Sequence, residues 1–359
     1  MPRPLTAIID LGALRHNLNV VKRHASHSRV IAVIKGNAYG HGLLRAAQAL
    51  AGADGVALLE LDAAVRLRDS GYRKRLILLE GLFGPAELDV AARYDLAFVI
   101  HDGAQLRMLD GARSDARFDV LLKINTGMNR LGFTPRAAID ARERLKTHRA
   151  VGQLTLMTHF ASADEADGVA WQMKVFDEIA AGQKLPRCLA NSAAILRYPE
   201  THADWVRPGI MLYGCTPFAG IPAHEFGLRP AMTLASELIA VRDLQPGDRV
   251  GYAGAFAAPQ AMRVGVVACG YADGYPRHAP TGTPIVVGGR RTRTLGRVSM
   301  DMLCADLTGI AAAGIGTAVT LWGDGMAADD VAAAAGTVSY ELLCALAPRV
   351  PVSEVGSET

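Results

Sequence analysis

The chain has 359 residues, of which 50% are hydrophobic and 20% charged, and its formal net charge is +3. This composition is that of a globular protein with a sizeable core, and the length predicts one large domain with a smaller one. The small net charge and the lack of a basic run with interleaved aromatic residues argue against nucleic-acid binding, and no apolar stretch is long enough to span a bilayer.

The first residues, MPRPLTAIIDLGALRHNL, contain no apolar signal core, so we expect a cytoplasmic protein. TAIID predicts a short strand, and Asp10 is placed to cap a helix over 11–25. The five cysteines are odd in number, widely spaced and without Cys/His ligand spacing. They predict reduced, mostly buried thiols and no metal site.

From residue 29 the chain alternates short apolar runs with helical patterns, such as those over 61–70, 137–148 and 169–182. Eight strand candidates separated by helix-length segments predict an α/β fold, a (β/α)8 barrel over residues 1–230. A doubly wound sheet is the alternative, but the first run leads into KGNAYGHG, which lacks the glycine-rich dinucleotide signature. The eight runs are 29–34, 55–60, 75–80, 96–100, 119–125, 153–159, 187–191 and 205–214.

After residue 230 the pattern changes to short β-rich runs divided by Gly, Pro and Asp turns. Residues 231–359 are therefore expected to form a second, mainly β domain. One helical pattern stands in it, over 326–336, and ELLCALAPRVPV closes the chain.

Barrel enzymes carry their chemistry where strands end, and these positions hold several reactive side chains. Lys35 ends the first run, Ser192 follows strand seven, and the amides of Gly209 and Ile210 lie in strand eight, and barrels often bind phosphate at the loops after these two strands. A phosphate site facing a lysine fits a phosphorylated carbonyl cofactor held as a Schiff base, with pyridoxal 5'-phosphate (PLP) the first candidate. A sugar-phosphate lyase would use similar parts and stays open on this reasoning. The strand-end residues are Lys35, Lys123, Arg130, His159, Asn191, Ser192, Arg207, Gly209 and Ile210.

Nine motifs, in order from residue 32 to residue 341, together resemble the alanine racemase family, whose members depend on PLP. The resemblance implies a cytoplasmic homodimer that interconverts L- and D-alanine by a two-base proton transfer. It also implies that D-alanine is supplied for peptidoglycan or enters alanine catabolism. The motifs are AVIKGNAYGHG, LKINTGMNRLGF, THFASADE, ANSAA, VRPGIMLYG, VGYAGAF, GYADGYPR, GRVSMD and VSYE.

The resemblance implies that Lys35 holds the cofactor as a Schiff base and acts as one catalytic base. It places the second base on Tyr252, which reaches the cofactor of the other subunit, so that the active site is shared between two chains. Without the resemblance, Lys35 would be a rim lysine with its amine in solvent, and Tyr252 a packing tyrosine of a β-strand.

Further roles follow from the same resemblance. Arg207 faces the pyridine nitrogen of PLP and, since arginine keeps its proton, leaves that nitrogen unprotonated. Arg130 and the backbone N–H of Met300 bind the substrate carboxylate. Tyr271 and Arg277 line the channel by which substrate reaches the site. The cofactor-binding set is Lys35, Tyr39, Arg130, His159, Asn191, Ser192, Arg207, Gly209, Ile210 and Tyr340.

Lys123 matches a lysine that several family members carry as a carbamate paired with the arginine equivalent to Arg130. The chain departs from the family nearby, because Asn125 stands where many members have aspartate. The missing charge leaves carbamylation of Lys123 as a hypothesis.

Three alternatives remain beside an alanine racemase. The first is a racemase of broader specificity or one for serine or lysine. The second is a non-catalytic PLP-binding protein, but such proteins resemble the barrel alone, whereas Tyr252 lies in the β domain. The third, an amino-acid decarboxylase, is disfavoured because its β-domain cysteine motif is absent and Arg207 occupies the pyridine position.

Overall fold

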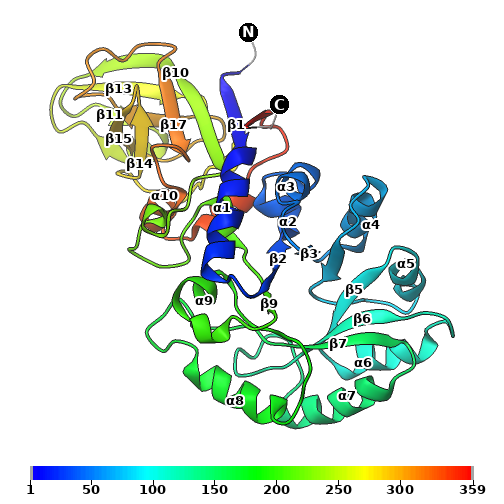
Figure 1. Cartoon of the computed structure of the whole chain (residues 1–359). Helices are drawn as coiled ribbons and strands as arrows, with labels where there is room; N and C mark the ends of the chain where they lie inside the picture. Colours follow the sequence, from blue (N-terminus) through cyan, green and yellow to red (C-terminus); the bar gives the residue numbers. More distant parts are fainter. Residues whose placement is uncertain (1–2, 357–359) are drawn as a thin grey trace.

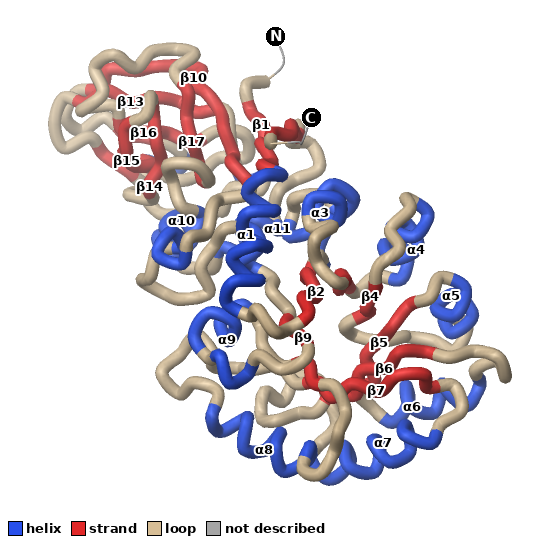
Figure 2. The backbone as a smooth tube through the Cα atoms, viewed as in Figure 1, coloured by secondary structure: helices blue, strands red, loops and turns tan. Residues whose placement is uncertain are grey.

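The computed structural model describes residues 3–356, and it folds into a closed barrel and a mainly β region joined through the long helix α1 (Leu11–His24) (Figure 1). Asp10 caps this helix as expected, because its side chain accepts a hydrogen bond of 2.9 Å from the N–H of Ala13. Figure 2 shows the strands of the barrel as a ring with helices outside it.

The barrel consists of eight parallel strands that pair in chain order and close between the last and the first. Each strand overlaps one of the eight predicted runs, which confirms the predicted barrel, although β8 covers only the first two residues of the run 187–191. The strands are almost wholly buried, as strands covered by helices on the outside must be. They are β2 (Arg29–Val33), β3 (Gly55–Leu58), β4 (Arg75–Leu78), β5 (Leu96–Ile100), β6 (Phe118–Lys123), β7 (Val151–Met157), β8 (Arg187–Cys188) and β9 (Trp205–Val206).

The last predicted run, 205–214, is a strand only over its first two residues. Pro208 has no N–H to give to a neighbouring strand, and the chain turns at Gly209 into the 3-10 helix η3 (Ile210–Tyr213). The prediction of a strand through residue 214 was therefore wrong beyond Val206, and the turn brings Gly209 and Ile210 to the mouth of the barrel.

The helices around the barrel include four that the sequence indicated and five short ones that it did not. The predicted four are α1, α4 (Leu61–Asp69), α7 (Pro135–Thr147) and α8 (Ala170–Ala180). The others are α2 (Lys35–Tyr39), α3 (Leu43–Ala49), α5 (Glu87–Arg93), α6 (Gly103–Met108) and α9 (Ser192–Arg197). Short 3-10 turns complete this part: η1 (Leu109–Gly111), η2 (Pro199–Thr201) and η4 (Ala223–Phe226).

The second region is a mixed sheet in which the long strand β10 (Met232–Leu244) pairs with β1, β13 and β17 along its length. This confirms the expected mainly β region. The sheet also contains β13 (Met262–Val267), β14 (Pro284–Val287), β15 (Arg290–Leu295), β16 (Leu303–Asp306), β17 (Ala318–Trp322) and β18 (Val352–Val355), while β11 (Arg249–Val250) and β12 (Phe256–Ala257) form a separate two-stranded sheet. Two 3-10 turns, η5 (Tyr252–Gly254) and η6 (Tyr271–Asp273), project from it.

The first strand, β1 (Leu5–Asp10), lies in this sheet and not in the barrel. It pairs antiparallel with β10 and parallel with β18. Residues 5–10 are thus hydrogen-bonded to the region that the sequence analysis began at residue 231, while the division at 230/231 itself stays a prediction.

Two helices stand in the second region. The expected helix over 326–336 is α10 (Ala328–Ala334), and a further helix, α11 (Ser339–Cys344), was missed. Helix α11 contacts α2, which carries Lys35, so it brings Tyr340 and Cys344 toward the mouth of the barrel.

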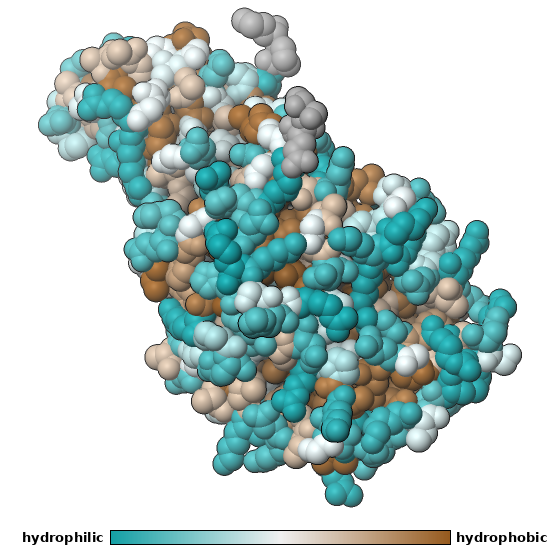
Figure 3. All heavy atoms as spheres, in the orientation of Figure 1, coloured by the Kyte–Doolittle hydropathy of each residue, from teal (hydrophilic) through white to brown (hydrophobic). Residues whose placement is uncertain are grey.

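The face shown in Figure 3 is mostly polar over the barrel helices, with apolar side chains gathered in small patches. Among residues 3–356, no helix has the length and apolar character needed to cross a membrane.

Candidate active site

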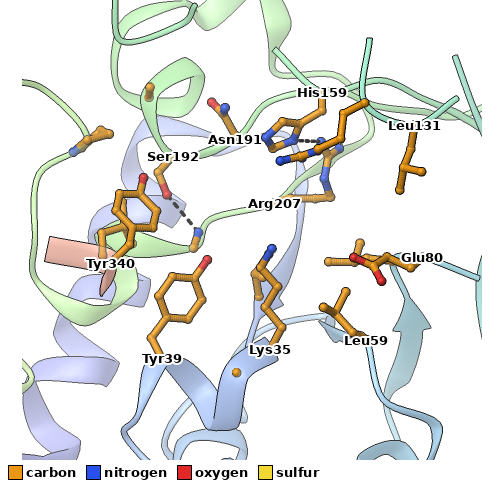
Figure 4. A pocket seen from close by; sticks show the side chains of 18 of the residues that line it. Lys35, Tyr39, Leu59, Glu80, Leu131, His159, Asn191, Ser192, Arg207 and Tyr340 are labelled. Atoms are coloured by element: carbon orange, nitrogen blue, oxygen red, sulfur yellow. Dashed lines mark hydrogen bonds between the residues drawn. The ribbon is translucent and has the colours of Figure 1, made fainter. Parts of the chain in front are cut away.

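A pocket of about 860 Å³ opens at the carboxyl ends of the barrel strands, between the barrel and α11. Figure 4 shows Lys35 and Tyr39 pointing into it from α2, with Ser192 and Arg207 facing them. Eleven residues singled out in the sequence line this one pocket: Lys35, Tyr39, Lys123, Arg130, His159, Asn191, Ser192, Arg207, Gly209, Ile210 and Tyr340.

The turn that carries Lys35 has an unusual backbone. Four consecutive residues, Gly36 to Tyr39, have φ between 51° and 59°, which is the left-handed region. Non-glycine residues pay about 1–2 kcal/mol each for this conformation. The turn directs Lys35 and Tyr39 to the same side, into the pocket (Figure 4).

Two side chains of the same motif hold this turn. Asn37, a residue type that tolerates the left-handed region, accepts a hydrogen bond of 2.9 Å from the N–H of Leu43 and so joins the turn to α3. His41 is fully buried, and its Nδ1 donates to the backbone oxygens of Tyr39 and Ala38 at 2.9 and 3.1 Å. The histidine of KGNAYGHG thus caps the turn and does not face the pocket.

Arg207 is buried at the centre of the pocket floor and is held by backbone oxygens. Its Nη1 donates to the carbonyl of Cys188 at 2.6 Å, and its Nη2 donates to those of Thr158 and Leu189 at 2.8 and 3.1 Å. No carboxylate within residues 3–356 pairs with it. Its Nη1 also donates to Sγ of Cys188 at 3.2 Å, so the guanidinium is a fixed positive charge of which only the Nε–H has no acceptor within residues 3–356.

His159 lies beside Arg207, with Nδ1 3.5 Å from Nη2 of the arginine. Burial and the positive charge of Arg207, followed by those of Lys123 and Arg130, hold the pKa of His159 well below its usual value. The imidazole is consequently neutral at neutral pH and can accept from the guanidinium.

Lys123 ends β6 and is only 7% exposed. Burial, followed by the positive charges of Arg207, Arg130 and Lys35, lowers the pKa of Lys123 to about 8. A fraction of this amine is neutral at physiological pH, which is the nucleophilic form. Lys123 is thus a reactive lysine inside a strongly cationic pocket.

Asn125 lines a small cavity together with Lys123, Arg130 and His159, but the hydrogen bonds of its side chain stay within the turn. Its Oδ1 accepts hydrogen bonds from the N–H groups of Gly127 and Asn129, both at 3.0 Å, and its Nδ2 donates to the side chain of Asn129 at 2.9 Å. Asn125 therefore shapes the turn that leads to Arg130. An aspartate here could still accept the hydrogen bonds from the N–H groups of Gly127 and Asn129. It would lose the bond that Nδ2 donates to the side chain of Asn129.

The opposite end of the pocket is a cradle of small groups and tyrosines. The Oγ of Ser192 accepts from the N–H of Gly209 at 2.9 Å, and Ile210, the first residue of η3, has an N–H with no acceptor inside its helix. A Cβ at Gly209 would lie 2.8 Å from the hydroxyl oxygen of Tyr39, so only glycine keeps this space open. Tyr39 also stacks on Tyr213, with ring centroids 4.5 Å apart.

The sequence analysis missed the acidic residues of the pocket. Glu60, Glu80 and Asp164 line it together with the five basic side chains, and Figure 4 shows the carboxylate of Glu80 pointing inward. Their position was a usable signal, because GVALLE and RLILLE place Glu60 and Glu80 at strand ends, where Lys35 was recognised. Cys344 of the missed helix α11 also lines the pocket.

Four residues expected at the site lie outside this pocket. Tyr252, Tyr271, Arg277 and Met300 belong to the β region and do not line the pocket of their own chain. Tyr252 is 68% and Met300 52% exposed, which is high for such side chains. They occupy a surface of the β region, with Arg277 over the ring of Tyr271.

Comparison with known proteins decides the family. A model of the alanine racemase N-terminal domain matches residues 9–217, and one of the alanine racemase C-terminal domain matches residues 231–353. The chain belongs to the alanine racemase family. It is 61% identical to the alanine racemase of Nitrosospira multiformis, over 98% of this chain and 99% of that one.

Solved structures agree over the whole chain. The biosynthetic alanine racemase of Pseudomonas aeruginosa superposes with a TM-score of 0.96 at 45% identity, over 98% of this chain and 99% of that one. The alanine racemase of Acinetobacter baumannii superposes with a TM-score of 0.92 at 37% identity, over 98% and 100%. The predicted membership, an isomerase of this family, is confirmed. The alternatives of a barrel-only binding protein and a decarboxylase are not favoured, because both racemase domains match.

Proposed function

We propose that this protein interconverts L-alanine and D-alanine with PLP bound in the pocket, by exchanging the α-proton between Lys35 on one face and Tyr252 of the partner subunit on the other. The observation that carries the proposal is the convergence of eleven residues singled out in the sequence on one pocket around Lys35, together with an exposed Tyr252 that does not line the pocket of its own chain. The family of the relatives supports alanine as substrate.

The pocket fits PLP. Lys35 supplies the amine, Arg207 a fixed cation for the pyridine nitrogen, and the Gly209 cradle the space and donors for a phosphate. Tyr39, Ser192, Ile210 and Tyr340 would complete the phosphate site, while Asn191 and His159 support the ring side of the pocket. When bound, PLP makes the α-proton of the amino acid acidic by spreading the charge left behind.

The protein supplies the two proton carriers. The Nζ of Lys35 takes or returns the proton on the face of the substrate turned toward α2. A single base would tend to return the proton to the side it left, so inversion requires a second group on the opposite face. The Tyr252 hydroxyl of the partner subunit is that group, which makes the homodimer the functional unit.

Fixed charges orient the substrate. Arg130, with the backbone N–H of Met300 of the partner subunit, binds the carboxylate, since a guanidinium pairs well with a carboxylate. Arg207 keeps its own proton and so cannot protonate the ring nitrogen, which restrains side reactions such as transamination. Tyr271 and Arg277 line the channel by which the substrate arrives.

Two aspects of the cellular role follow as proposals. The likeness to the biosynthetic enzyme of Pseudomonas aeruginosa supports supply of D-alanine for peptidoglycan over alanine catabolism. The five cysteines are all free thiols in the structure, which supports action in a reducing compartment, the cytoplasm.

Proton NMR in deuterated water, combined with chiral analysis, tests the reaction. With PLP and L-alanine, we expect loss of the α-proton signal together with the appearance of D-alanine. Tyr252→Phe should abolish inversion and leave cofactor absorbance unchanged. Exchange without inversion would contradict the role of Tyr252 as second base. If the PLP-loaded protein shows no exchange and forms no D-alanine, alanine racemisation is refuted.

Mixing two inactive variants tests the shared site. Lys35→Ala and Tyr252→Phe each remove one base, but a mixed dimer has one pocket with both bases intact. After random re-association of equal amounts, we expect about a quarter of wild-type activity, since half the dimers are mixed and each has one working site. No recovery from dimers shown to be mixed would mean that both bases come from the same chain.

The proposed carbamate on Lys123 follows from its environment. The neutral amine adds carbon dioxide and releases one proton, which turns a buried cation into an anion facing Arg130. Carbon-13 NMR with labelled bicarbonate is expected to show one carbamate signal that Lys123→Met lacks. An identical signal in the variant, or none in the wild type at about pH 8, where half the amine is neutral, would refute it.

A further inference from the structure

The exposed residues Tyr271 and Met300 lie on two segments that are hydrogen-bonded to each other. The N–H of Tyr271 donates to the backbone oxygen of Ser299, and that of Ala272 donates to the oxygen of Met300, both at 3.0 Å. Gly270 permits this close approach, because a Cβ there would lie 2.3 Å from the oxygen of Ser299. The turn 270–274 and the loop 299–302 are therefore hydrogen-bonded into one unit, here called the platform.

A buried charge cluster lies behind this platform. The carboxylate of Asp273 is fully buried and takes two bonds from the guanidinium of Arg3, at 2.6 and 2.8 Å. It also accepts from Nε of Arg349 at 2.8 Å and from the N–H of Gly270 at 2.9 Å. Burial alone would raise the pKa of Asp273, but the hydrogen bonds from Arg3 and Arg349 hold it below its usual value.

Both arginines also contact the second half of the platform. Arg349 Nη2 donates to the carboxylate of Asp301 at 2.6 Å, and Arg3 Nη2 donates to the backbone oxygen of Asp301 at 2.6 Å. Asp301 directly follows Met300. Each guanidinium thus connects the turn that carries Tyr271 with the loop that carries Met300.

The two arginines come from opposite ends of the described chain and are brought together by strand pairing. Arg3 precedes β1 and Arg349 precedes β18, and these strands pair in parallel, with Ala7 opposite Val352. Because β1 pairs in the sheet of the β region, it delivers the guanidinium of Arg3 to the same carboxylate that Arg349 contacts.

None of the three charged residues lines the substrate pocket, yet their cluster fixes the segments that would face the substrate. We propose that Asp273, with Arg3 and Arg349, is a positioning device that sets Tyr271 and the Met300 N–H against the pocket of the partner subunit. This inference rests on the proposed function, because Met300 matters to substrate only in the shared site. The cluster acts through the platform and touches no reacting atom.

The test compares Arg3→Gln, Arg349→Gln and the double variant in the PLP-loaded enzyme. A misplacement of about 1 Å far from the chemistry can cost up to about 100-fold, so we expect KM for L-alanine to rise about tenfold or more, with kcat changed less. Arg349→Lys keeps the charge, but its single nitrogen cannot bridge Asp273 and Asp301, and KM should stay raised.

The matched control is Glu354→Ala. Glu354 accepts a hydrogen bond of 2.7 Å from Nε of Arg45 and so ties the same C-terminal strand to α3, with no contact to the platform. Arg45 itself is kept, because its Nη1 also donates to the backbone oxygen of His41 at 3.2 Å. This variant should leave KM and kcat within about twofold, as surface ion pairs contribute little. A KM change equal to that of the Arg3 and Arg349 variants would mean that loosening the C-terminal strand in general raises KM, whether or not the platform is affected. That result would overturn the proposal.

Hydrogen exchange read by mass spectrometry supplies a readout that does not depend on activity. Peptides that contain 270–275 and 298–303 should exchange faster in both single variants, while barrel peptides stay as in the wild type. Unchanged exchange and unchanged KM in folded single variants would refute the proposal, even where the double variant fails to fold. If the wild-type enzyme does not racemise alanine, the proposed function is refuted instead. The hydrogen-exchange result would still test whether Arg3 and Arg349 hold the platform in place.

Discussion

The buried ring of His41 predicts a specific loss of stability in acid. Burial and the nearby positive charge of Arg45 lower its pKa from 6.5 to about 4, against the hydrogen bonds to Tyr39 and Ala38, which act in the opposite direction. The unfolded chain takes up a proton on this ring as pH falls through about 6.5, whereas the folded protein does so only near pH 4. The folded state therefore loses stability as pH falls across this window.

The size of the effect follows from the two pKa values. Between about pH 7.5 and pH 4.5, a shift of this size removes about 2.5 kcal/mol from the free energy of unfolding. The perturbation that isolates His41 is His41→Asn, because the amide of asparagine can replace the Nδ1 donor without titrating in this range. The smaller side chain lowers stability at every pH, by about 1–3 kcal/mol for the lost ring.

Urea unfolding of the cofactor-free protein at both pH values, at one protein concentration, measures the effect. The difference in the free energy of unfolding between the two pH values should be smaller in His41→Asn than in the wild type by about 2.5 kcal/mol. The buried His159 also makes the free energy of unfolding depend on pH, but it does so equally in both proteins and cancels when they are compared. Parallel pH profiles for the two proteins would refute the reasoning.

Three other substitutions test the packing of the site and of its scaffold. Arg207→Lys should lower the free energy of unfolding by about 2–4 kcal/mol in urea titrations, because a single ammonium leaves buried carbonyls without a donor. Gly209→Ala should weaken PLP binding about tenfold in absorbance titrations, since a new methyl 2.8 Å from the Tyr39 hydroxyl costs about 1–3 kcal/mol. Asn17→Ala should cost about 3 kcal/mol or more in thermal or urea unfolding, because the buried backbone oxygen of Leu212 and both backbone polar groups of Arg229 lose their partner. Losses below about 1 kcal/mol, or unchanged PLP affinity, would contradict these contacts.

The barrel could be predicted because its signal is repeated. Eight apolar runs separated by helix-length segments each become a buried strand, and Asp10 caps its helix as read from the sequence. Short elements could not be predicted this way. Helix α2 owes its form to left-handed residues fixed by tertiary contacts, and α11 has only six residues, too few for a periodic pattern.

The residues of the site also fall into a group that the sequence could locate and a group that it could not. Lys35, Arg207 and the cradle residues lie at strand ends, so topology alone gathers them, and the same rule extends to Glu80 once strand ends are read without regard to charge. Tyr252 and Met300 obey no such rule within one chain, because both side chains are exposed and only the proposed shared site gives them a role. The buried cluster around Asp273 could not be located from the sequence either. Its partners are far apart in sequence, and only the parallel pairing of β1 with β18 brings them together behind the surface that the second copy would meet.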